Sequence, residues 1–114
     1  MSPDPSDPDA LARAVAQVMW DRDLASRSLG MSLDEARPGA ATLSLTVTAA
    51  MTNGHKTCHG GYIFTLADSA FAFACNSGGE RTVAAHCSIT FLRPGALGDR
   101  LVATAREVSR SGRS

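Results

Sequence analysis

A single carboxylate stands in the most apolar stretch of the chain, the run CHGGYIFTLADSAFAFACNSGG from Cys58 to Gly79. Between Gly61 and Asn76 the run has the pattern of a helix that is hydrophobic on nearly all sides, and Asp68 is its only charged residue. Burying an isolated charge is costly unless it is paired, hydrogen-bonded or protonated, so Asp68 is a candidate for acid–base or nucleophilic chemistry. The alternative is that Asp68 faces a solvent-filled gap or bonds to a neighbour such as Ser69 or Arg106.

The start of the same run carries the tripeptide His59-Gly60-Gly61. Glycine lets a ligand approach the backbone, and the first N–H groups of a helix point outward without intrahelical acceptors. Together with the positive end of the helix dipole, these donors favour an anion or a developing oxyanion. The alternative is that the two glycines only form a tight entry from the preceding loop.

The spacing of these two features points to a second copy of the chain. Eight residues separate Gly60 from Asp68, which is roughly 12 Å along a helix axis. A catalytic carboxylate must lie about 3 Å from its reacting atom or water, so one chain can hardly bring both groups to one substrate. Two antiparallel copies of the helix, related by a two-fold axis, would place each Asp68 beside the other copy's Gly60.

The segments that must position these groups begin with a predicted flexible tail, residues 1–8, which is rich in proline and aspartate. Ser6 or Asp7 then caps an N-terminal helix with Pro8 in its first turn. The helix is expected to bury the apolar stripe formed by Leu11, Val15, Val18 and Met19. Gly30 is a candidate stop signal beyond it.

Three segments, 41–48, 82–91 and 99–108, alternate apolar and polar residues as half-buried strands do. The apolar helical run, 61–76, lies between the first two of them. The order helix, strand, long helix, strand, strand favours one α+β domain over residues 9–114, with a mostly antiparallel sheet.

Composition narrows the class of partner. Eleven basic and eleven acidic residues cancel, so no overall field favours nucleic acid or an anionic membrane surface. The longest apolar run contains Asp68 and falls short of the roughly 20 residues that cross a bilayer. Cys58, Cys75 and Cys87 cannot all pair within one chain and no leader precedes them, so we expect a reducing compartment, the cytoplasm.

The segment NGHKTCHGGYIFTLADSAFAFA, from Asn53 to Ala74, closely resembles the hotdog-fold thioesterases, specifically the phenylacetate-pathway (PaaI-type) acyl-CoA thioesterases. The likeness extends through ITFLRPGALGD to about Ala105, and more weakly back through MWDRDLASRSLGM. It implies a hotdog fold, in which an antiparallel sheet wraps around a long central helix, with an additional N-terminal helix. It also implies hydrolysis of an acyl-CoA thioester, with an aromatic acyl group such as hydroxyphenylacetyl, and a dimer-of-dimers tetramer.

The resemblance implies a role for each matching residue. In such enzymes the Gly60 N–H would polarise the thioester carbonyl, and Gly61 would permit close approach. Asp68 of the partner subunit would activate water as a general base or attack the carbonyl itself, in an active site at the homodimer interface. His59 matches a residue that orients the site, and Asn53 a loop residue near the acyl group. The family uses no metal and no bound cofactor, since coenzyme A belongs to the substrate.

The chain departs from the family pattern in two places. Arg22 stands where similar proteins often carry an asparagine that helps at the active site. Hotdog chains also continue with further strands, so we expect the C-terminal strands to be missing from this chain. Arg93, in the segment FLRPG, either contacts a coenzyme A phosphate through its guanidinium or is a solvated strand end.

Other readings of the same residues remain open. His55, Cys58 and His59 lack a fourth partner at a zinc-site spacing, so no metal is expected. Cys58 as a nucleophile has two histidines nearby, but nothing orients either of them. The phenylalanines of the helical run either line an acyl pocket or fill the core; these are Phe64, Phe71 and Phe73.

Two alternative functions follow. Within the same fold, His59 and Asp68 could transfer protons at carbon in an acyl-thioester dehydratase or isomerase. Alternatively, the protein could bind acyl-CoA without turnover, which Arg22 and the expected missing strands favour. Release of free thiol from an acyl-CoA separates hydrolysis from dehydration, and the variant Asp68→Asn distinguishes an enzyme from a binding protein.

Overall fold

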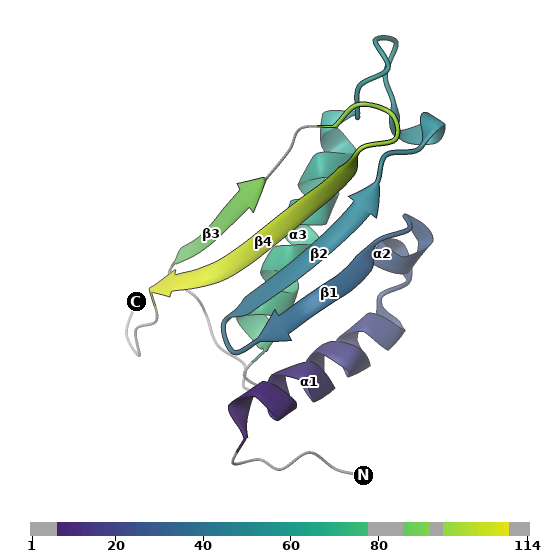
Figure 1. The fold of residues 1–114 in the computed structure, drawn as a ribbon. Coiled ribbons are helices and arrows are strands. Elements are labelled where there is room, and N and C mark those ends of the chain that lie inside the picture. The colour runs from purple at the N-terminus through teal and green to yellow at the C-terminus, as the bar shows by residue number, and fades with distance from the viewer. Residues whose placement is uncertain (1–6, 78–85, 92–94, 110–114) are drawn as a thin grey trace.

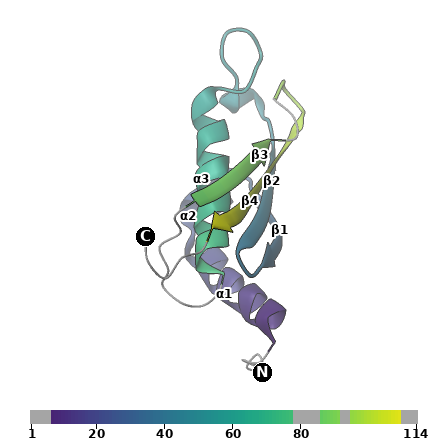
Figure 2. The same ribbon diagram turned by 90° about the vertical axis from the view of Figure 1, so that its left-hand side faces the viewer.

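The computed structural model describes residues 7–77, 86–91 and 95–109. Within these residues, strands in the order β1-β2-β4-β3 form one antiparallel sheet. Helix α3 lies against one face of the sheet, and α1 runs beside the edge strand β1 (Figures 1 and 2). The strands are β1 (Ser32–Arg37), β2 (Ala40–Thr46), β3 (His86–Phe91) and β4 (Arg100–Ser109), and the main helices are α1 (Pro8–Arg22) and α3 (Gly60–Asn76). The predicted α+β class with an antiparallel sheet is confirmed.

Helix α1 begins as predicted, with Asp7 as its N-cap. The Asp7 Oδ1 accepts hydrogen bonds from the N–H groups of Asp9 and Ala10, at 3.1 and 3.2 Å. The predicted apolar stripe is wrong at Val18, which is 52% exposed, whereas Leu11, Val15 and Met19 are partly buried. Met19 packs against the core, and the fully buried residues of the helix are Ala12 and Ala16. Small side chains here let the α1 backbone approach the rest of the fold closely.

The chain turns sharply after α1 into a short second helix, α2 (Leu24–Ser28), whose N-cap is Asp23. The Asp23 N–H donates to the Trp20 carbonyl at 3.1 Å, and the Arg27 guanidinium donates to the Asp21 carbonyl at 2.8 Å. These bonds occupy two carbonyls that the end of α1 leaves without intrahelical donors. Gly30, at φ +79°, then ends the helical segment as predicted.

Strand β1 is an element that the sequence patterns did not predict. Its two inward residues, Leu33 and Ala36, lie three positions apart instead of two or four. The cause is a register shift between Leu33 and Glu35 in the pairing with β2, which breaks the period-two alternation. Gly39, at φ +73°, completes the turn into β2.

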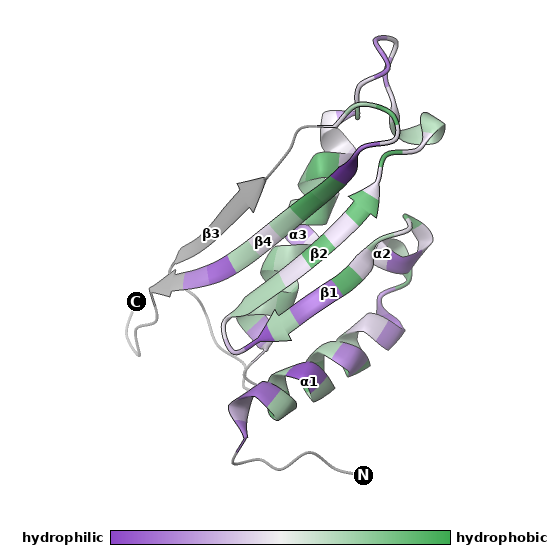
Figure 3. Ribbon diagram, viewed as in Figure 1, coloured by the Kyte–Doolittle hydropathy of each residue, from purple (hydrophilic) through white to green (hydrophobic). Residues whose placement is uncertain are grey.

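The core lies between α3 and the inner face of β2 and β4. Leu43 pairs with Ala103 across these strands, and both are fully buried. The alternation predicted for β2 is confirmed on this face, where Ala41, Leu43 and Leu45 are all buried. Figure 3 shows α3 as predominantly apolar, whereas α1 alternates between apolar and polar segments. In the part of the chain that the structure describes, no helix is long and apolar enough to cross a membrane.

The entry to α3 is braced by loop-to-loop bonds. After β2 the chain forms the short helix η1 (Ala49–Met51) and then a loop, residues 52–58, which projects beyond the sheet (Figure 1). The Cys58 N–H donates to the Gly95 carbonyl at 2.8 Å, and the His59 N–H donates to the Met51 carbonyl at 2.7 Å. The two residues directly before α3 are therefore held by two different segments of the chain.

Candidate active site

The N-terminus of α3 presents an unused backbone donor. His59 is the N-cap, and its Nδ1 accepts a hydrogen bond from the Gly61 N–H at 3.3 Å. Among the described residues, no acceptor pairs with the N–H of Gly60, the first helical residue. The first turn of α3 contains no acidic side chain, so the positive end of the helix dipole is not neutralised there. This terminus can therefore stabilise an incoming negative charge.

The two glycines at this position are not required by the packing of the chain itself. A Cβ on Gly60 would meet nothing within 4 Å, and one on Gly61 would lie 3.7 Å from the His59 Nδ1. Neither residue has a positive φ. Nothing in the packing or backbone conformation of this chain therefore requires glycine at these two positions. The open space beside them leaves room for close approach by a molecule outside this chain.

Asp68 lies two turns further along α3, and in the single chain it faces solvent, which corrects the prediction that it is buried and agrees with the solvent-facing alternative. The residue is exposed, and it makes no hydrogen bond or ion pair with the described residues. Ser69, which the sequence offered as its partner, turns inward and bonds to Ser26. The carboxylate of one chain is therefore free to act on a group that the chain does not provide.

Asp68 belongs to an open stripe along α3 that the sequence reading did not recognise. Phe64 is 71% exposed and Phe71 is 38% exposed, although both are large apolar side chains. With Gly61 and Asp68 they follow the spacing 3, 4, 3 that places residues on one helix face. The sequence could have revealed the stripe through this spacing. The third phenylalanine, Phe73, is 1% exposed and packs against Trp20 with ring centroids 6.2 Å apart.

Asn53 organises the loop that precedes the site. Its Oδ1 accepts hydrogen bonds from the His55 N–H, the Thr57 N–H and the Thr57 hydroxyl, at 2.8, 3.3 and 3.1 Å. The same loop holds Lys56 at φ +63°, a backbone conformation that non-glycine residues seldom adopt. The side-chain carbonyl of Asn53 is thus committed to loop structure, which leaves its amide NH₂ as the group available for a substrate.

Cys58 is buried directly before this helix, at 7% exposure. Burial raises the pKa of its thiol, because the apolar surroundings disfavour the thiolate. A thiol that stays protonated is a poor nucleophile, so the geometry does not support covalent catalysis by Cys58. Within the described residues, no three His, Cys, Asp or Glu side chains come together as metal ligands.

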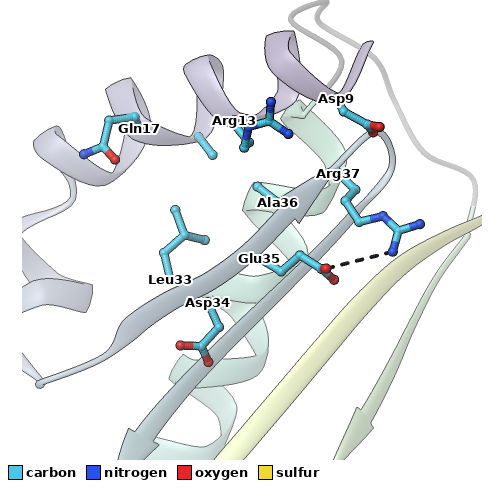
Figure 4. A pocket seen from close by; sticks show the side chains of 9 residues that line it. Asp9, Arg13, Gln17, Leu33, Asp34, Glu35, Ala36 and Arg37 are labelled. Atoms are coloured by element: carbon cyan, nitrogen blue, oxygen red, sulfur yellow. Dashed lines mark ion pairs between the residues drawn. The ribbon is translucent and has the colours of Figure 1, made fainter. Parts of the chain in front are cut away.

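A pocket of about 470 Å³ lies elsewhere, between α1 and β1 (Figure 4). Its rim carries both charges, and the Arg37 guanidinium lies 3.9 Å from the Glu35 carboxylate. The lining residues are Asp9, Arg13, Ala16, Gln17, Leu33, Asp34, Glu35, Ala36 and Arg37. None of these is a predicted site residue. Of the predicted set, the structure brings His59, Gly60 and Gly61 together; Arg93 lies outside the described residues.

Comparison with known proteins assigns the class. Residues 55–114 match the family model of the Thioesterase superfamily. This match covers more than half of the chain, and the chain belongs to that superfamily.

Individual relatives agree with this assignment. The acyl-coenzyme A thioesterase PaaI of Escherichia coli K12 is 50% identical over 91 residues, which are 80% of this chain and 65% of the relative. The structure of the E. coli PaaI protein from the phenylacetic acid degradation operon matches with a TM-score of 0.82 and 44% identity, covering 93% of this chain and 77% of that one. The TT0310 protein of Thermus thermophilus matches with a TM-score of 0.66 and 41% identity, covering 79% of this chain and 76% of that one.

These matches make the fold a hotdog fold of the PaaI type, as the sequence resemblance predicted. The chain spans 65% of the length of the curated E. coli relative.

Proposed function

We propose that the protein is an acyl-CoA thioesterase whose active site forms between two copies of the chain. One observation carries the proposal: the open Gly60 N–H and the exposed Asp68 carboxylate lie on one helix, and neither has a partner among the described residues. Two turns of helix separate them, which is too far for both to reach one carbonyl carbon. A second, antiparallel α3 would place the Gly60 N–H of each chain beside the Asp68 carboxylate of the other chain.

The open stripe on α3 supports a second copy as the covering partner. Phe64 and Phe71 flank Asp68 on that stripe, and such exposed apolar residues on a helix are typical of an interface. A two-fold axis brings the stripe of one copy against the same stripe of the other copy, so both stripes would be buried at one interface. We extend this to a dimer of dimers on the strength of the family resemblance.

In the proposed reaction the thioester carbonyl oxygen accepts a hydrogen bond from the Gly60 N–H. The carboxylate of Asp68 of the partner subunit removes a proton from water, whose oxygen bonds to the carbonyl carbon. Negative charge then develops on the carbonyl oxygen, where the helix N-terminus stabilises it. The carbon–sulfur bond breaks, the free acid forms, and the coenzyme A thiolate takes the proton from Asp68. Direct attack by Asp68 on the carbonyl is the other route open to this carboxylate.

His59 has a defined part in this scheme. Its Nδ1 accepts the Gly61 N–H bond, so the ring caps the helix and holds the turn that carries the Gly60 donor. In the neutral ring the proton is then on Nε2. This cap supports an orienting role for His59 over a role as the proton-transferring base of a dehydratase.

The acyl group we propose is aromatic, such as hydroxyphenylacetyl, because aromatic side chains beside Asp68 can stack on a ring. We propose Asn53 and Gly61 as further substrate contacts, and Arg93 as a contact to a coenzyme A phosphate. The reaction needs no cofactor beyond the coenzyme A of the substrate. We place it in the cytoplasm, since three cysteines in one chain cannot all form internal disulfides.

The direct test is the variant Asp68→Asn, assayed by thiol release from hydroxyphenylacetyl-CoA. We expect kcat to fall by about 10²- to 10⁴-fold, while binding of coenzyme A, measured by calorimetry, persists. Glu35→Gln is the matched control, because this exposed carboxylate lies on β1 away from α3, and it should leave kcat unchanged. Unaltered thiol release by Asp68→Asn would remove the assigned role.

Mixing two inactive variants tests whether the site is shared. Gly60→Pro removes the N–H donor, whereas Asp68→Asn removes the carboxylate, and a mixed dimer contains one site with both groups intact. Random exchange of subunits should restore about a quarter of the wild-type activity. Failure to recover any activity, with exchange verified by mass spectrometry, would mean that the two groups do not act together across the interface, and the shared site would be excluded.

A further inference from the structure

A buried chain of hydroxyl groups joins α2 to α3 next to Asp68. The Ser26 Oγ and the Ser69 Oγ lie 2.7 Å apart, and the two residues are 1% and 8% exposed. The Ser26 hydroxyl also donates to the Asp23 Oδ2 at 2.7 Å, and the Ser26 N–H donates to the Asp23 Oδ1 at 3.0 Å. One carboxylate therefore anchors a line of hydrogen bonds that crosses between two helices.

The direction of this chain follows from the number of protons. Ser26 has one hydroxyl proton, and it is used in the bond to Asp23. Ser69 must therefore donate to Ser26, since Ser26 has only lone pairs left on that side. A serine within a helix commonly bonds to the carbonyl four residues earlier, but here the hydroxyl of Ser69 is directed outward from its own helix to another.

A second contact, one turn later, holds the same side of α3. Phe73 lies four residues after Ser69, on the same face of the helix, and packs against Trp20 of α1. The bend between α1 and α2 thus holds α3 at two successive turns. Leu66 and Ala70, both fully buried, hold the adjacent face against the sheet.

Asp68 is positioned only through this backbone. Its side chain makes no hydrogen bond or ion pair with the described residues, so no contact of its own fixes where the carboxylate points. Ser69 is the next residue along the chain, and rotating or shifting α3 at Ser69 moves Asp68 with it. A displacement of about 1 Å at a catalytic group can cost roughly 10²-fold in rate.

We propose that the chain Asp23–Ser26–Ser69 is a positioning device for Asp68, with Ser69 and Ser26 as positioning residues for thioester hydrolysis. The inference rests on the proposed function. Buried hydroxyls are costly unless bonded, and alanines would pack at this contact without that cost. What the hydroxyl pair adds is one defined register between α2 and α3, which alanines would leave less defined. A defined register fixes the position of the backbone at Asp68, the residue directly before Ser69.

The test uses Ser69→Ala, Ser26→Ala and the double variant, assayed by thiol release from hydroxyphenylacetyl-CoA. We expect each single variant to lower kcat roughly ten- to a hundred-fold with KM nearly unchanged. Because both residues act through one bond, the double variant should lose no more than the more damaged single variant. Ser69→Thr keeps the hydroxyl, so its kcat should lie closer to that of the wild type than to that of Ser69→Ala.

A matched control is Thr104→Val. The hydroxyls of Thr42 and Thr104 lie 3.3 Å apart across β2 and β4, on the sheet face that points away from α3. Removing this hydroxyl should leave kcat within about twofold of wild type. Melting temperatures of all variants separate a loss of folded protein from a loss of rate.

If wild type releases no thiol, the proposed function fails and the positioning role with it. If wild type is active but Ser69→Ala and Ser26→Ala change only the melting temperature, the function stands and the positioning role is overturned. Additive losses in the double variant would also overturn it, since the two hydroxyls would then act separately.

Discussion

The two long faces of helix α3 both carry large apolar residues, but one face is buried and the other is exposed. On the inner face Leu66, Ala70 and Phe73 are at most 1% exposed, enclosed by the sheet and by the bend between α1 and α2. On the outer face Phe64 and Phe71 remain exposed beside Asp68. Both faces carry phenylalanine, but other residues of the chain bury only the phenylalanine of the inner face.

This difference separates stability from function along one helix. Residues of the inner face lose apolar surface to the chain's own core, so changing them should alter the free energy of unfolding. Residues of the outer face contribute little to the protomer, so changing them should alter assembly and catalysis. The following predictions test that separation, beginning with the largest expected effect.

Phe73→Ala should lower the free energy of unfolding by about 3–5 kcal/mol, because it leaves a cavity in a closed part of the core. Phe64→Ala removes a side chain of the same type from the outer face. Its effect should depend on protein concentration, because in the proposed dimer Phe64 contacts the partner subunit. Urea titrations at several protein concentrations measure both; a concentration-independent loss of similar size for Phe64→Ala would contradict the separation.

Gly60→Pro should lower kcat by about 10²- to 10³-fold, because it removes the proposed oxyanion donor. Proline is well tolerated at the first helical position. His59, at φ −63° and ψ 135°, already has the backbone conformation that a residue before proline requires. Gly60→Ala is the matched control that keeps the N–H, and its Cβ meets no atom of this chain within 4 Å. Equal activity of the two variants would exclude the N–H as a catalytic donor.

Gly95→Ala should cost about 1–3 kcal/mol of stability through overpacking. A Cβ there would lie 2.8 Å from the Leu101 Cδ2 and 2.9 Å from the Val47 Cγ2, and both neighbours are 1% exposed. Gly54→Ala is the control, since its Cβ would meet nothing within 4 Å. Thermal unfolding of the pair measures the contrast between a glycine required by internal packing and a glycine in open space. Equal melting temperatures would refute it.

The smallest effect concerns Cys58, whose pKa is raised by burial. The folded chain then holds this proton at a pH where the unfolded chain releases it. The associated stability is complete below the unfolded-state pKa and is lost as pH rises through the folded-state pKa. Melting temperatures from about pH 7 to about pH 10 should therefore fall more steeply for wild type than for Cys58→Ala. Parallel curves would show that the buried thiol does not contribute.

The predictable parts of the fold were those with unbroken periodicity. Ala41, Leu43 and Leu45 alternate strictly and face the core as expected, and the Asp7 cap lies where its residue type suggested. Strand β1 escaped prediction because its bulge moved Ala36 out of step with Leu33. The stripe predicted for α1 was wrong at Val18, because helical spacing alone does not show which side meets the core: Val18 is exposed, and Ala12 is buried.

For the candidate site, local order along the chain determined much of what can be known. His59, Gly60 and Gly61 meet at the start of a helix because they are consecutive, and Asp68 lies on that helix because nothing in the run interrupts it. Only tertiary structure decided that Asp68 is exposed, that Ser69 bonds to Ser26 across 43 residues of sequence, and that Phe73 is buried while Phe64 is not. The physical reason is that burial depends on which surfaces pack together, and segments distant along the chain supply those surfaces.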